Sequence, residues 1–101
     1  MTTGLKAQTL GHMHGVSWED LFAIDAGGLT NATRANFQVE ILVGNGVTRA
    51  NCFYSGSGAL TLAEFNTLPI GSTILAYGLT TRTLYVLGAA ATWYDVEFAA
   101  V

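Results

Sequence analysis

Charge and cysteine are both scarce in this chain, and each shortage excludes a class of protein. Four Lys and Arg stand against seven Asp and Glu, which gives a formal net charge of -3. Because nucleic-acid-binding domains carry basic patches, this balance argues against a nucleic-acid partner. The one cysteine, Cys52, excludes a disulfide within the chain. No sequence neighbour activates its thiol, so we interpret Cys52 as a small buried hydrophobe in a strand.

Long apolar runs are missing as well. The uninterrupted apolar stretches are short, such as 89–91, whereas a membrane-spanning helix needs about 18 residues or more. The first fifteen residues contain no apolar segment behind a basic start, so we expect neither a secretory signal nor a membrane partner. With 50% hydrophobic and only 11% charged residues, disorder is excluded too, because disordered chains combine low hydrophobicity with high charge.

The beginning of the chain differs in pattern from the rest. Glycines interrupt it, and its apolar residues follow neither a strand nor a helix period. We therefore expect an extended N-terminal arm over 1–16 and a single β-rich domain over 17–101. Purely solvated arms need no apolar side chains, so we expect this arm to lie across a neighbouring subunit through Leu5, Leu10 and Met13.

Helical signals occur twice and are short. Ser17 precedes Trp18-Glu19-Asp20, which favours a capped helical turn ended by Gly27-Gly28, although a buried strand over 20–24 is a rival interpretation. Thr61 and Glu64 have the spacing of a capping box, in which each side chain caps the other's backbone N–H.

Period-two patterns dominate the remainder. Phe37 to Val43 predicts a half-buried strand with its odd-numbered residues inward, and Asn45-Gly46 predicts a tight hairpin into a second strand over 47–54. Further strands are expected over 72–77, 81–87 and 92–98. In the last strand we expect the inward face to consist of Tyr94, Val96 and Phe98. The outward face is then formed by Trp93, Asp95 and Glu97.

These elements predict an all-β fold. Five to eight short strands with turn signals every 8–12 residues are typical of a small antiparallel β-sandwich or barrel, here with one or two short helical turns.

Candidate chemistry is weak throughout. His12 and His14 could share a cation, but a zinc site usually needs three or four ligands. The acids Glu19, Asp20 and Asp25 could form a glycosidase-like pair, yet they fit helix and turn roles better. No serine lies in a nucleophile elbow. We expect no catalytic residue, no cofactor and no metal site, and hence no enzyme; a small hydrolase is a distant alternative.

Three segments resemble sequences that recur in small virion proteins of tailed bacteriophages. They are Pro69-Ile70-Gly71-Ser72-Thr73-Ile74, then Thr80 to Val86 with its Leu84-Tyr85-Val86, then Ala91-Thr92-Trp93-Tyr94-Asp95-Val96. The resemblance implies strand, hairpin and strand in a head or tail structural protein. It also implies a virion location, with assembly in the host cytoplasm.

The composition is consistent with such a role, because surfaces buried between subunits are depleted in charge. We expect a capsid decoration (cement) protein that bridges shell subunits, with the major capsid protein or other virion subunits as partners. Self-association is also expected, and the resemblance implies a trimer. We expect the interface to include Trp18, Phe22 and Trp93 besides the arm. The alternative is a carbohydrate- or receptor-binding β-domain of a phage tail or fibre, with a tryptophan as stacking platform.

Overall fold

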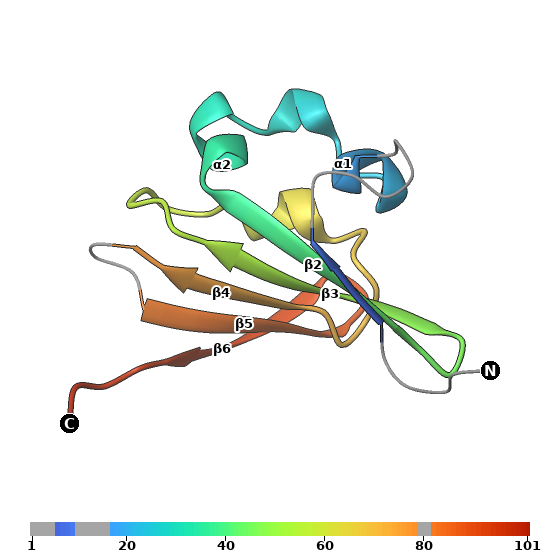
Figure 1. The fold of residues 1–101 in the computed structure, drawn as a ribbon. Helices are drawn as coiled ribbons and strands as arrows, with labels where there is room; N and C mark the ends of the chain where they lie inside the picture. Colours follow the sequence, from blue (N-terminus) through green and yellow to red (C-terminus); the bar gives the residue numbers. More distant parts are fainter. Residues whose placement is uncertain (1–5, 10–16, 79–81) are drawn as a thin grey trace.

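A single mixed β-sheet forms the body of the protein (Figure 1). The computed structural model describes residues 6–9, 17–78 and 82–101. Six strands lie in the sheet in the order in which they occur in the chain. They are β1 (Lys6–Thr9), β2 (Phe37–Gly44), β3 (Val47–Tyr54), β4 (Thr73–Tyr77), β5 (Arg82–Ala89) and β6 (Thr92–Glu97). All neighbouring strands are antiparallel except β3 and β4, which are parallel.

Short helices cover one face of this sheet (Figure 1). They are α1 (Trp18–Leu21), the 3-10 turn η1 (Ala26–Gly28), α2 (Asn31–Ala35) and the 3-10 turn η2 (Leu62–Phe65). None of the described helices lies on the opposite side, which we call the open face. The predicted all-β class is confirmed, because short strands dominate and both α-helices are short. None of the helices in the described ranges is long and apolar enough to span a membrane.

The β2–β3 hairpin forms as the sequence predicts. Asn45 and Gly46 have φ angles of 53° and 76°, the left-handed conformation that a two-residue hairpin turn of this type requires. The odd-numbered residues Phe37, Val39 and Ile41 are buried, so the predicted inward face of β2 is confirmed.

Three stacked aromatic rings hold the helical layer on the sheet. Phe37 of β2 stacks on Phe65 of η2 at a centroid distance of 4.6 Å and on Trp18 of α1 at 5.2 Å. Phe65 is completely buried and Trp18 is 6% exposed. Aromatic pairs of this kind contribute about 0.5–1.5 kcal/mol beyond the area that they bury. The stack therefore joins three segments that are distant in sequence.

The parallel β3–β4 pair requires a crossover, because a hairpin cannot join parallel strands. The connection passes over the covered face and carries η2 with it. At its end, the buried Ser72 hydroxyl accepts a hydrogen bond of 3.0 Å from the Ala50 N–H. The backbone N–H of Gly71 donates to the Leu87 carbonyl at 2.7 Å, which ties the crossover to β5.

The helical predictions are partly right. The Ser17 hydroxyl accepts from the Asp20 N–H, as expected of the cap of α1, so the rival strand over 20–24 is wrong. The capping box at Thr61 is also wrong, since its side chain makes no capping hydrogen bond and the Glu64 carboxylate lies against Gly28 instead. Helix α2, capped by the Thr30 hydroxyl through the Thr33 N–H, was not predicted.

The expected arm lies mostly outside the described residues. Its described part, Lys6–Thr9, pairs with β2 of the same chain, with Lys6 opposite Val43 and Thr9 opposite Glu40. These four residues thus pair within their own chain rather than with a neighbouring subunit, while the arm over 1–16 as a whole stays a prediction. The physical reason is that β2 would otherwise present an unpaired edge, which a short extended segment satisfies.

We expect replacement of Phe65 by alanine to lower the free energy of unfolding by about 3–5 kcal/mol, because it removes one completely buried ring of the aromatic stack and leaves a cavity. The matched control is Ile70→Ala, at a side chain that is 59% exposed, where we expect a change within about 0.5 kcal/mol. Urea unfolding of both variants at one protein concentration measures this. Equal losses for the two variants would contradict the role of the stack.

Candidate functional site

The open face of the sheet carries an unusual amount of apolar surface. Phe53, Leu75, Leu84 and Val96 are direct neighbours across the four strands β3 to β6. We call these four residues the apolar row. At about 4.8 Å between strands, the row is roughly 14 Å long. Val96 is 60% exposed and Phe53 38%, so the row is accessible to a partner.

Polar side chains adjoin the row on one side. Glu40, Asn51 and Thr73 form the parallel line of neighbours on β2, β3 and β4. The Thr73 hydroxyl donates to the Asn51 side-chain oxygen at 3.1 Å, which leaves the Asn51 amide group free of that bond. This line continues on β5 and β6 with Val86 and Tyr94. The face is therefore polar toward β2 and apolar toward β6.

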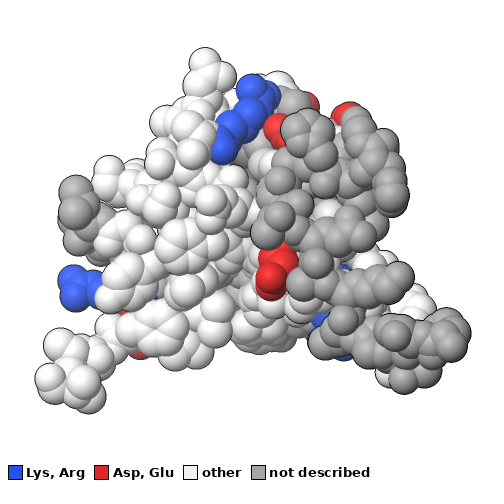
Figure 2. All heavy atoms as spheres, in the orientation of Figure 1, with Lys and Arg blue, Asp and Glu red and all other residues white. Residues whose placement is uncertain are grey.

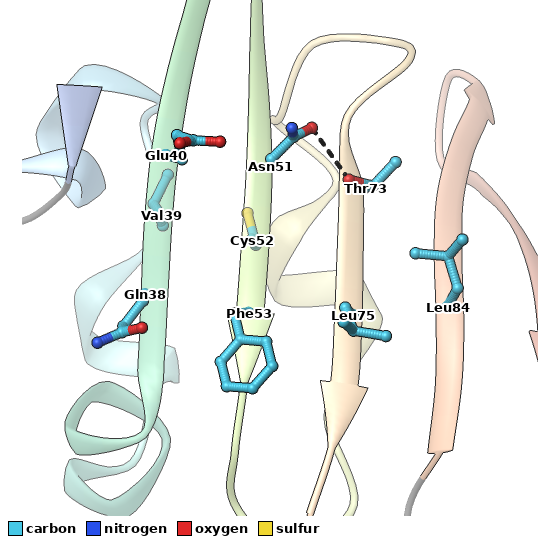
Figure 3. A pocket seen from close by; sticks show the side chains of 9 residues that line it. All are labelled: Gln38, Val39, Glu40, Asn51, Cys52, Phe53, Thr73, Leu75 and Leu84. Carbon is cyan, nitrogen blue, oxygen red and sulfur yellow. Dashed lines mark hydrogen bonds between the residues drawn. The ribbon is translucent and has the colours of Figure 1, made fainter. Parts of the chain in front are cut away.

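The surface between these residues is hollowed. Figure 3 shows Phe53, Leu75 and Leu84 on one side of the depression and the Asn51–Thr73 hydrogen bond on the other, with the helices behind the strands. Its volume is about 610 Å³, and Gln38 and Glu40 border it at β2. A neighbouring hollow of about 320 Å³ lies between Leu42, Arg49 and Gly71. Charged side chains are sparse on the visible surface of the described residues (Figure 2).

Strand β6 faces the opposite way from the prediction. Tyr94 and Val96 lie on the open face at 59% and 60% exposure, and Phe98 is 45% exposed. Trp93 is half-buried on the covered face, where it lies opposite Leu87, and its indole N–H donates to the Asn66 side-chain oxygen at 2.8 Å. Because β6 is an edge strand, Asp95 and Glu97 are exposed although they lie on the covered side. The position of these polar residues in the sequence therefore did not indicate which side of β6 faces away from the core.

A glycine fits Tyr94 to this face. The pairing of β5 with β6 is irregular between Leu87 and Ala89, so Gly88 lies in a bulge. A Cβ atom at position 88 would overlap the Tyr94 ring, and the ring therefore lies directly on the glycine backbone. This contact fixes the position of an exposed aromatic ring at the edge of the open face.

The predicted interface residues are not gathered at one place. Leu5, Leu10 and Met13 lie outside the described residues. Trp18 and Phe22 are each 6% exposed and belong to the core of the chain, so their place in an interface stays a prediction. Helix α1 places the Trp18 ring on Phe37. Trp93 packs against the core as well and is only partly accessible.

The candidate catalytic groups are engaged in local structure. Glu19 forms an ion pair with Arg34 at 3.4 Å, which joins α1 to α2, and the Asp25 carboxylate accepts from the Gly27 N–H at 3.0 Å. His12 and His14 lie outside the described residues. In the described ranges, no three His, Cys, Asp or Glu side chains are placed to hold a metal ion.

Sequence reasoning missed the apolar row, although a signal was present. In β4 and in β5, both alternating sets contain apolar residues, such as Ile74 with Leu75 and Leu87 with Leu84. Strands that are apolar on both faces are typical of sheets covered on both sides.

The fit between Gly88 and Tyr94 can be tested with a double-mutant cycle. We expect Gly88→Ala to lower the free energy of unfolding by about 1–3 kcal/mol, because the added methyl displaces the ring. In a Tyr94→Ala background the same change should cost much less, since the ring is absent. Urea unfolding of the four proteins gives the coupling energy. Strictly additive effects would rule out the contact.

Burial raises the pKa of the Cys52 thiol from its ordinary value of 9.0 to about 12. Between these two values the unfolded chain releases the thiol proton while the folded protein keeps it, so unfolding is favoured as the pH rises. We therefore expect the stability of the protein to fall from pH 9 toward pH 12 more steeply than that of Cys52→Ala. Parallel curves in urea unfolding across this range would contradict the prediction.

No protein-family model, curated protein or solved structure matches this chain.

Proposed function

We propose that this chain is a non-enzymatic structural protein of a tailed-phage virion, a capsid decoration (cement) protein that stabilises the shell by bridging its subunits. The observation that carries the proposal is the apolar row on the open face. A sheet face in contact with water normally carries mainly polar side chains, whereas this face has apolar side chains next to one another on four strands. Exposed apolar patches of this kind mark interaction sites. The row supports burial of this face in an assembly.

The β-sandwich expected from the sequence needs a second sheet, and we include the source of that sheet in this proposal. The described strands form one layer, with helices on its other side. A second β-layer, at about 10 Å from the first, would come from a neighbouring subunit packed on the open face. The fold would then be completed only in the assembly, and the chain would work as a homo-oligomer together with the major capsid protein.

Stabilisation would follow from mass action. A protein that binds the assembled shell, but not its separated subunits, stabilises the shell by RT ln(1 + [L]/Kd), which is about 2.7 kcal/mol at a concentration of 100 times Kd. No catalytic group is needed for this role. Scarce charge also fits it, because charged residues are depleted at the centre of interfaces.

The alternative, a carbohydrate- or receptor-binding domain, has one observation in its favour. Tyr77 and Tyr94 on the open face are 51% and 59% exposed and could stack on sugar rings. The tryptophans on which this alternative first rested are less suitable, since Trp18 is buried and the Trp93 N–H is bonded to Asn66. Glycan binding that Tyr94→Ala abolishes, without any binding to shells, would favour the alternative.

The test is co-sedimentation of the purified chain with phage shells from which it has been removed. We expect saturable binding and a higher melting temperature of the shells. Leu84→Glu should weaken binding at least tenfold, because it places a charge within the apolar row; tenfold corresponds to about 1.4 kcal/mol. Ile70→Glu, which changes an exposed aliphatic residue in the loop before β4, should bind as the wild type does. Absence of the chain from purified virions would overturn the proposal.

A further inference from the structure

We infer that the open face binds the same face of a second copy of this chain, across a two-fold axis that runs along the strands between β4 and β5. This inference deepens the proposed function, since it names the partner of the face on which that function rests. It is carried by three properties of the face: its self-matching apolar row, the placement of its polar groups and its area.

The apolar row matches its own copy. Its four residues lie on β3 to β6, so the middle of the row falls between Leu75 and Leu84. A two-fold axis at this point places Leu75 opposite the partner's Leu84, and Phe53 opposite the partner's Val96. Two rows of equal length then cover each other, which an isologous contact requires. A sheet packs on a sheet with strand directions within about 30°, so the two rows overlap along their length.

The polar groups fit the same arrangement. The axis brings Asn51 of one copy over the Tyr94 end of the other, because Asn51 on β3 and Tyr94 on β6 are equally far from the axis between β4 and β5. The free amide group of Asn51 can then donate to the Tyr94 hydroxyl of the partner. Of the charged residues on the open face of β2 to β6, Glu40 lies beyond the overlap and Arg49 and Arg82 lie near strand ends. All three charges therefore stay at the hydrated rim, as in stable interfaces.

The strands give an estimate of the area of the face. β3, β4, β5 and β6 contain 8, 5, 8 and 6 residues, and about 3.3 Å along each strand with about 4.8 Å between strands gives a flat patch of roughly 430 Å², rim included. A standard interface buries about 800 Å² of accessible surface on each partner, so the relief of the side chains and the hollows must supply about half of a standard contact. The hollow of about 610 Å³ beside Phe53, Leu75 and Leu84 gives room for the partner's side chains.

A dimer of this kind explains how the protein could bridge. Two-fold symmetry presents the helical layer twice, once on each outer side of the pair. Two identical surfaces on one particle can bind two shell subunits at once, and the second binding event is then intramolecular. The contact also gives an even number of chains, in contrast to the trimer that the resemblance implies.

The test uses the isolated wild-type protein and two pairs of matched variants. Native mass spectrometry and sedimentation at micromolar concentration should show two chains per particle. Leu84→Glu should raise the dimer dissociation constant at least tenfold, whereas Leu21→Glu, on α1 of the covered side, should leave it unchanged. Far-ultraviolet circular dichroism checks that both variants are folded. A monomeric or trimeric wild type would overturn the inference.

Cross-linking locates the axis. In Leu75→Cys, a short bismaleimide should give a covalent dimer and no larger species, since each chain meets one partner. Leu21→Cys should give no dimer, and the native Cys52 should not react with the bismaleimide because it is buried. Equal cross-linking at both positions would contradict the assigned face.

Shell binding separates the two proposals. A monomer that binds shells through Leu84 would overturn the dimer and leave the decoration function standing. A dimer that does not bind shells would support the dimer and overturn the decoration function.

Discussion

Parallel pairing of β3 with β4 is the constraint on which the rest of this structure depends. A chain can join antiparallel neighbours with two residues, but parallel neighbours oblige it to leave the sheet and return. The returning segment must lie on one side, and here it carries Phe65 onto the same side as Trp18. Once that side holds the aromatic stack, the short helices can bury their apolar residues only there. The single parallel contact therefore decides which face is covered and which is left open.

The open face follows from this imbalance. The described residues contain one crossover and a few helical turns with which to cover a six-stranded sheet, and both lie on one side. The strands are nevertheless apolar on both sides in β4 and β5. Burying the remaining apolar row is favourable by roughly 25 cal/mol for each Å² removed from water. The molecule is consistent with a subunit whose second layer lies outside its own chain.

Local patterns predicted the local structure well. The Asn45-Gly46 turn requires positive φ angles that few residue pairs accept, and the Ser17 hydroxyl accepts from the backbone N–H of Asp20, only three residues away. Both features could therefore be identified from neighbours in the sequence. The inward side of β2 followed from its alternation, and the extents of β2 to β6 followed from runs of strand-forming residues between turn signals. The all-β class followed from the sum of these elements.

The candidate site could not be predicted in the same way, because it depends on pairing between distant strands. The orientation of β6 in the structure is the opposite of the predicted one. Trp93 lies on the covered face because its indole N–H donates to Asn66, 27 residues away, and the acids of an edge strand can reach water from either face. The apolar row exists only through the register of β3 with β4, β5 and β6. A sequence pattern contains the alternation of each strand but not its register against the next.

Each strand from β3 to β6 pairs with the strand that precedes it in the chain, and this order shapes how the protein folds. The loop between β2 and β3 is the two-residue turn, so this hairpin closes at little entropic cost, and β4, β5 and β6 can then add in succession. Strand β1 is also next to β2 in both chain and sheet, but residues 10–36 separate the two strands. Contacts between distant residues form slowly, and a four-residue edge strand holds few of them. We therefore expect β1 to join the sheet last and to leave it first, so that hydrogen exchange at β2 reports on the opening of this edge while the hairpin stays closed.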